Sequence, residues 1–151
     1  NEKLIKCISN KNIKIKKFWS FELKNFRNKF DGSEHYALTK GKFTKSKASR
    51  VRVISTNVLN SFFNFKKDIF KNSLKYLNKS NNFALILVKG TNLNPSSSEN
   101  NKILRYYGIG AQLIKELNIK KMILVSRSIK RVIALDGYGI RITKQEIMKW
   151  K

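Results

Sequence analysis

The sequence of 151 residues contains few acidic side chains and very little cysteine, histidine or proline. Its 9 Asp and Glu stand against 33 Lys and Arg, which gives a formal net charge of +24. Cys7 is the one cysteine, so an internal disulfide and any metal site built from several cysteines are excluded. His35 is the one histidine and adds little to the set of metal ligands. We therefore predict that the chain binds no zinc and no cofactor.

Long apolar runs are also missing. The longest, residues 83–88, has six residues, whereas a helix that spans a membrane needs about 20. No membrane span is therefore expected. The apolar content of 41%, including ten Phe, is sufficient for one core, and a chain of this length fits one domain.

Hydrophobic periodicity predicts a mixture of strands and helices after residue 30. Apolar and polar residues alternate at 35–43 and 50–55, as they do in strands. Residues 59–77 place their apolar side chains on one helical face, and the continuous apolar run 83–88 is typical of a central strand buried on both faces. The other expected elements are a loop at 91–102, a helix at 111–117, a strand at 122–125, a turn or short helix at 130–134 and a strand at 139–143. This order indicates a mixed α/β fold.

Residues 1–30 have a different composition, with nine basic residues interleaved with aromatic ones. We interpret them as a basic N-terminal extension, followed by a domain at 31–147 and a tail at 148–151. Lysines among aromatic rings can follow a phosphate backbone while the rings stack on bases. The alternative is a helix or strand whose aromatic residues cover the edge of the domain, since Phe usually lies in a core.

Four segments of the chain carry motifs of a known kind. The segment 105–124, which contains GIGAQ at 108–112, and the later LDGYG at 135–139 are similar to the C-terminal half of the GTP cyclohydrolase II family. DGSEHYAL at 31–38 and VRVIS at 51–55 resemble two upstream pieces in the same order. The resemblance covers most of residues 31–145 and implies a mixed sheet with flanking helices.

The same resemblance implies a zinc ion, held by three cysteines, that activates water against the purine ring. Asn57 stands at the first cysteine position, and residues 61–67 offer no cysteine for the other two. Ile103 replaces the family's proton-accepting aspartate, although Arg105 keeps the position of the nucleophilic arginine. We therefore expect a pseudoenzyme with no catalytic residues. What the resemblance leaves is a vestigial nucleotide site at Arg52, Arg105, Ser126 and Arg131.

The surplus of positive charge leads us to expect RNA as the partner, because counterion release gives basic surfaces affinity for phosphate backbones. The prediction is a non-catalytic structural protein of an organellar ribosome, mitochondrial or alternatively plastid, that contacts ribosomal RNA and neighbouring ribosomal proteins. Asn1 in place of an initial Met is consistent with a removed presequence or a missing start. The expected RNA contacts are Lys14, Lys16, Lys17, Lys71, Lys75, Lys79, Lys120, Lys121, Arg127, Lys130 and Arg131.

Other interpretations remain open. Lysine-rich codon usage could produce a basic surface with no RNA partner, and the basic cluster at 120–131 could be an inherited phosphate pocket that is now empty. The chain could also bind GTP weakly without turnover, or serve as the partner subunit of an active GTP cyclohydrolase II.

Overall fold

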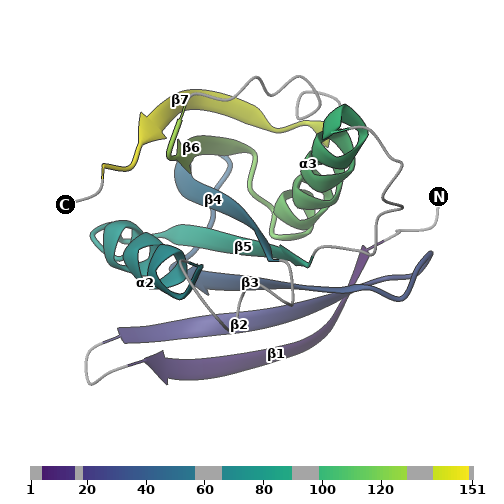
Figure 1. Ribbon diagram of the computed structural model, residues 1–151. Helices are drawn as coiled ribbons and strands as arrows, with labels where there is room; N and C mark the ends of the chain where they lie inside the picture. The colour runs from purple at the N-terminus through teal and green to yellow at the C-terminus, as the bar shows by residue number, and fades with distance from the viewer. Residues whose placement is uncertain (1–4, 16–18, 57–65, 90–98, 129–137, 150–151) are drawn as a thin grey trace.

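In the computed structural model, the described part of the chain comprises residues 5–15, 19–56, 66–89, 99–128 and 138–149 (Figure 1). Its strands form one seven-stranded sheet. The strands are β1 (Ile5–Ile15), β2 (Trp19–Asn28), β3 (Glu34–Lys40), β4 (Ser49–Thr56), β5 (Phe83–Lys89), β6 (Lys121–Ser126) and β7 (Arg141–Ile147). The two helices of this part are α2 (Lys66–Leu77) and α3 (Glu99–Glu116). The mixed sheet with flanking helices that the sequence predicted is confirmed.

The sheet has an antiparallel half and a parallel half that meet at β5. Its order is β1-β2-β3-β5-β4-β6-β7. The pairs from β1 to β5 are antiparallel, and those from β5 through β4 and β6 to β7 are parallel. The predicted central position of residues 83–88 is therefore confirmed, with three strands on either side.

Each face of the sheet is covered by a different helix. Alternate residues of β5 point to opposite faces, so that Ala84 and Ile86 pack with α3 residues such as Leu113 in one core cluster. Phe83 and Leu85 belong to a second cluster that includes Leu74 and Leu77 of α2. A continuous apolar run is the expected composition for a strand with two buried faces.

The residues that the sequence marked as a basic extension form the first two strands of this sheet. β1 and β2 make an antiparallel hairpin, and β2 pairs with β3 from Glu22 to Arg27. Ile5, Phe21 and Phe26 are almost fully buried in the two core clusters. The alternative interpretation, in which these aromatic residues cover the edge of the domain as part of a strand, matches the observed packing.

Helix α3 begins earlier than the sequence indicated. The expected helix at 111–117 is largely the end of a helix that runs from Glu99 to Glu116, so residues 99–102, which were expected in the loop at 91–102, are helical. Residues 90–98 and 129–137, which include the expected turn at 130–134, lie outside the described residues. Among the helices of the described part, none combines the length and apolar character needed to cross a membrane.

Candidate functional site

Arg52 and Ser126, two of the four residues expected in a nucleotide site, lie close together. Arg52 is 6% exposed and Ser126 is 7% exposed. The Arg52 guanidinium donates a hydrogen bond through Nε to Ser73 Oγ at 2.8 Å and through Nη1 to the Val125 carbonyl at 3.5 Å. Arg52 therefore ties β4 to α2 and to the end of β6, directly beside Ser126.

These contacts give Arg52 a structural role in the described fold. Ser73 Oγ in turn donates to the Ile69 carbonyl at 2.6 Å, so that the hydroxyl links the guanidinium to the helix backbone. The Ser126 hydroxyl donates to the Ser128 carbonyl at 2.6 Å and closes the turn after β6. Arg131 and the side chain of Arg105 lie outside the described residues, so the structure places only part of the expected site.

The zinc that the family resemblance implies does not fit the side chains present. Cys7 lies on β1, where its thiol donates a hydrogen bond to the Ser9 carbonyl at 3.4 Å. The position expected for the first zinc ligand, Asn57, is outside the described residues and directly follows β4. Three strands separate β1 from β4, which is about 19 Å at the usual spacing of neighbouring strands. One thiolate at that distance cannot replace three.

His35 is buried and engaged through both ring nitrogens. Its Nδ1 accepts a hydrogen bond from the Lys89 amide at 3.0 Å, and its Nε2 lies 2.9 Å from Ser33 Oγ. The imidazole thereby joins the start of β3 to the end of β5. Among the residues that the structure describes, no three His, Cys, Asp or Glu side chains gather closely enough to hold a metal ion.

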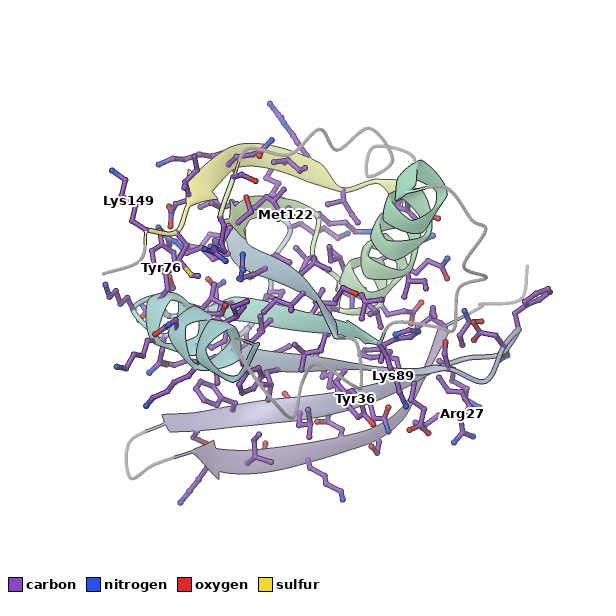
Figure 2. The ribbon with its side chains drawn as sticks, in the orientation of Figure 1. Arg27, Tyr36, Tyr76, Lys89, Met122 and Lys149 are labelled. Carbon is purple, nitrogen blue, oxygen red and sulfur yellow. The ribbon has the colours of Figure 1, made fainter. Side chains whose placement is uncertain are left out.

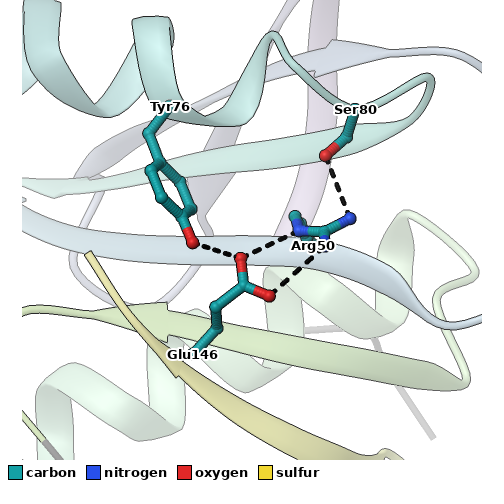
Figure 3. A network of polar contacts seen from close by, with 4 residues as sticks. All are labelled: Arg50, Tyr76, Ser80 and Glu146. Carbon is teal, nitrogen blue, oxygen red and sulfur yellow. Dashed lines mark hydrogen bonds and ion pairs between the residues drawn. The ribbon is translucent and has the colours of Figure 1, made fainter. Parts of the chain in front are cut away.

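A polar network that the sequence did not reveal joins α2, β4 and β7 (Figure 3). Arg50 makes a bidentate ion pair with Glu146, through Nε to Oε1 at 3.0 Å and Nη2 to Oε2 at 3.3 Å. The Tyr76 hydroxyl donates to the same carboxylate, and Arg50 Nη1 donates to Ser80 Oγ at 3.1 Å. Arg50 and Glu146 are 96 positions apart in the sequence, so no local motif could have paired them.

The network shifts the ionisation of its members. The hydrogen bond from Arg50 holds the pKa of Glu146 below its usual value of 4.5. Burial, followed by the hydrogen bond to Glu146, raises the pKa of Tyr76 to about 12. The Glu146 side chain is 17% exposed and that of Arg50 is 35% exposed, so the pair is partly shielded from solvent.

The described lysines among those expected to contact RNA lie on several elements of the fold. Lys14 lies on the edge strand β1, whereas Lys71, Lys75 and Lys79 are exposed on α2 and just after it. Lys120 and Lys121 stand at the start of β6 and Arg127 follows its end, so Lys121 and Ser126 are separated by about 17 Å of extended strand. Lys16, Lys17, Lys130 and Arg131 are outside the described residues.

The curated relatives of this chain include proteins named for riboflavin biosynthesis. It is 26% identical over 156 residues to the riboflavin biosynthesis protein RibBA of Aquifex aeolicus, a match that covers 85% of this chain and 38% of that protein. It is also 26% identical over 149 residues to the 3,4-dihydroxy-2-butanone 4-phosphate synthase of Photobacterium phosphoreum, covering 84% of this chain and 39% of the relative. The chain thus spans well under half the length of these relatives.

A solved structure has the same fold. RibBX of A. baumannii, a two-domain 3,4-dihydroxy-2-butanone 4-phosphate synthase, superimposes with a TM-score of 0.65 and 23% sequence identity. The superposition covers the whole of this chain and 42% of RibBX. At this identity the likeness establishes the fold alone.

These relatives overturn the prediction of an RNA-binding protein of a mitochondrial ribosome. The reported relatives are named as a riboflavin biosynthesis protein or as a 3,4-dihydroxy-2-butanone 4-phosphate synthase, and none is named as a ribosomal or RNA-binding protein. The prediction was wrong because net charge describes the electrostatic field around a protein and does not identify the molecule that the field attracts.

The family itself is shown by the sequence. The family described as GTP cyclohydrolase II matches residues 6–94 and 71–146, which together span nearly the whole chain. The first match begins within β1, so the hairpin of β1 and β2 falls inside the matched region. The motifs at 31–38, 51–55, 108–112 and 135–139 all lie within it as well. This chain belongs to the GTP cyclohydrolase II family.

Proposed function

We propose that this chain is a non-catalytic GTP cyclohydrolase II domain that works in riboflavin biosynthesis beside a 3,4-dihydroxy-2-butanone 4-phosphate synthase. The observation that carries the proposal is the set of metal donors in the chain. Its one cysteine lies on the far edge of the sheet from β4, and its one histidine is engaged in the hydrogen bonds that join β3 to β5. A zinc-activated water needs several protein ligands in one place.

The side chains of β4 support the same proposal. Ile54 is apolar and packs against the core cluster beneath α2. Arg52 is bound to Ser73 and to a backbone carbonyl, so the fold itself uses its donors. Ile103, at the position of the proton-accepting aspartate, cannot exchange a proton. The chain keeps the fold of the family, but an apolar side chain, Ile103, stands at the position where the family's reaction requires proton transfer.

The association with a synthase is supported by the relatives. RibBX is described as a two-domain 3,4-dihydroxy-2-butanone 4-phosphate synthase, and the whole of this chain superimposes on 42% of it. The relative from Photobacterium phosphoreum is named as the same synthase, and this chain matches 39% of its length. A domain of this fold therefore occurs within longer proteins that carry the synthase name.

The non-catalytic half of the proposal is tested by measuring formate release from GTP in the presence of added zinc. We expect no release above the rate without protein, whereas a family member with three zinc-binding cysteines releases formate under the same conditions. Formate release that disappears in an Arg105→Gln variant would contradict the proposal, because Arg105 keeps the position of the family's nucleophile.

The partnership is tested by titrating the chain into a 3,4-dihydroxy-2-butanone 4-phosphate synthase from the same organism. We expect a complex with a Kd of about 1 μM or tighter, measured at moderate salt so that the charge of +24 does not bind acidic proteins indiscriminately. Lysozyme, which is also basic, serves as the control. A specific partnership would be excluded if this chain and lysozyme bound the synthase equally well, or if neither of them bound it.

A further inference from the structure

A polar pocket lies where the amino ends of β4 and β5 meet. Its volume is about 510 Å³, and its walls come from the loop before β4 and the turn between α2 and β5. Lys42, Lys47 and Lys79 line it together with Arg50, Ser80 and Asn82, and the described lining contains no carboxylate. The predicted position of the first zinc ligand, Asn57, follows the other end of β4. That strand has eight residues, so roughly 20 Å or more separates the two places.

The two segments that form the pocket are locked together. Asn82 Nδ2 donates to the Lys42 carbonyl and to Ser49 Oγ, both at 3.1 Å. Gly41 has a φ of +78°, and a Cβ atom there would stand 2.5 Å from the Asn81 carbonyl oxygen. Only glycine permits this approach, so the lysine-bearing loop sits directly on the turn. A pocket whose walls are fixed in this way loses little conformational entropy when it binds a ligand.

The charge of the pocket comes mainly from its lysines. The Arg50 guanidinium is paired with Glu146, and it also donates to Ser80 Oγ. Its charge is therefore largely compensated, and the three lysines supply the uncompensated positive field. Ammonium groups that line one pocket beside the Ser80 hydroxyl are well suited to the oxygens of a phosphoryl group.

A second groove adjoins this pocket and shares Lys79 with it. It has a volume of about 550 Å³ and is lined by Tyr76, Ile147 and Lys149 among others. Ile147 is 42% exposed, and Lys79 Nζ lies 5.8 Å from the centre of the Tyr76 ring. Figure 2 shows Tyr76 and Lys149 on one side of the molecule and Lys89, at the carboxyl end of β5, on the other. The groove offers apolar surface beside a cationic pocket.

We propose that this end of the sheet binds a small phosphorylated metabolite. Lys42, Lys47 and Lys79 hold its phosphoryl group in the pocket, and the remainder of the ligand lies along Tyr76 and Ile147 in the groove. This site is separate from the place that the family uses for zinc, and it does not depend on whether the chain works with a synthase.

Isothermal titration calorimetry with inorganic phosphate and phenyl phosphate tests the proposal. Ionic strength is held constant with NaCl, because a protein of charge +24 attracts every anion weakly. We expect both probes to bind the full chain, with phenyl phosphate binding more tightly. In a Lys42→Gln/Lys47→Gln variant, the Kd for both should rise at least about tenfold, since two charge-assisted contacts are lost.

A matched variant separates the pocket from the overall charge. Lys11→Gln/Lys14→Gln removes the same two charges from exposed positions on β1, and we expect less than about a twofold change in Kd there. Equal weakening in the two variants, or no heat of binding with either probe, would overturn the proposal. So would binding that weakens in Arg105→Gln and persists in the pocket variant.

The groove is tested through the exposed isoleucine. Ile147→Ser should weaken phenyl phosphate severalfold and leave inorganic phosphate unchanged, because only the organic part of the ligand reaches that side chain. An equal loss of affinity for phenyl phosphate and for inorganic phosphate would contradict the assignment of the groove. Thermal unfolding of each variant, without ligand, verifies that the fold persists.

Discussion

Glu146 is one of only nine acidic residues in a chain with 33 basic ones, and it holds together parts of the molecule that are far apart in sequence. Its carboxylate accepts hydrogen bonds from Arg50 on β4 and from Tyr76 on α2. Partial burial and the hydrogen bond to a carboxylate both favour the protonated form of a phenol, which is why the pKa of Tyr76 rises to about 12. The stability that this hydrogen bond contributes therefore depends on pH at the alkaline end.

A Tyr76→Phe variant should lose about 1–2 kcal/mol of unfolding free energy at pH 7, because the ring stays and one hydrogen bond to a charged acceptor is removed. The usual tyrosine pKa of 10.0 describes the unfolded chain, and the folded value is about 12. The tyrosine's contribution is complete below pH 10 and disappears as the pH rises through 12. The advantage of the native protein over the variant should shrink over that interval.

Urea denaturation of both proteins between pH 7 and 12 measures this difference. Lysines also titrate there, but they are the same in both proteins and cancel in the comparison. A difference in unfolding free energy that stays constant across the interval would mean that the phenol is not coupled to Glu146.

The individual residues of the candidate sites were only partly predictable. Arg52 and Ser126 were chosen through their place in family motifs, and the structure does bring them together. The sequence could not show that Arg52 is occupied by Ser73, or that Arg50 pairs with Glu146, because both contacts join segments that meet only in the folded sheet. Lysine spacing likewise could not place Lys42, Lys47 and Lys79 around one pocket.

The strands whose apolar residues either alternate with polar ones or form a continuous run were predicted from the sequence. The strands whose buried residues are separated irregularly by lysines were not. β4, β5 and β6 were recognised from short apolar patterns. In β2, Phe21 and Phe26 belong to the two different core clusters, so the strand buries side chains on both of its faces. With lysines between them, the simple alternation of a strand is hidden, and the segment was interpreted as an extension.

The hairpin of β1 and β2 should therefore contribute strongly to stability. Phe26 is 1% exposed, and we expect Phe26→Ala to cost about 3–5 kcal/mol of unfolding free energy through lost burial and the cavity that remains. Phe30, just beyond β2, is 87% exposed, so Phe30→Ala should change stability by less than about 0.5 kcal/mol. Chemical denaturation of the two variants measures both values. Similar small effects in the two would show that the hairpin is dispensable to the core.

At the scale of the whole molecule, charge and fold have separate consequences. The GTP cyclohydrolase II fold is specified by the core clusters and the sheet, which apolar residues build. Most of the basic side chains whose burial the structure describes are exposed to solvent. Composition was therefore informative about the electrostatic field and uninformative about the biological process. The motifs, which report on backbone and packing, identified the family.

The same charge makes a prediction about salt. Even if all 9 acidic residues were paired, 24 basic ones would remain without a partner, and their mutual repulsion opposes the compact state. Salt weakens that repulsion, but it also weakens attractive pairs such as Arg27 with Glu34, which is 2.9 Å long and exposed. Because the repulsive pairs are far more numerous, raising NaCl from 0.1 to 1 M should raise the Tm by about 2–4 °C, equivalent to roughly 1 kcal/mol. Differential scanning calorimetry at neutral pH measures this shift, and a Tm that falls with NaCl would mean that a few local ion pairs outweigh the net charge.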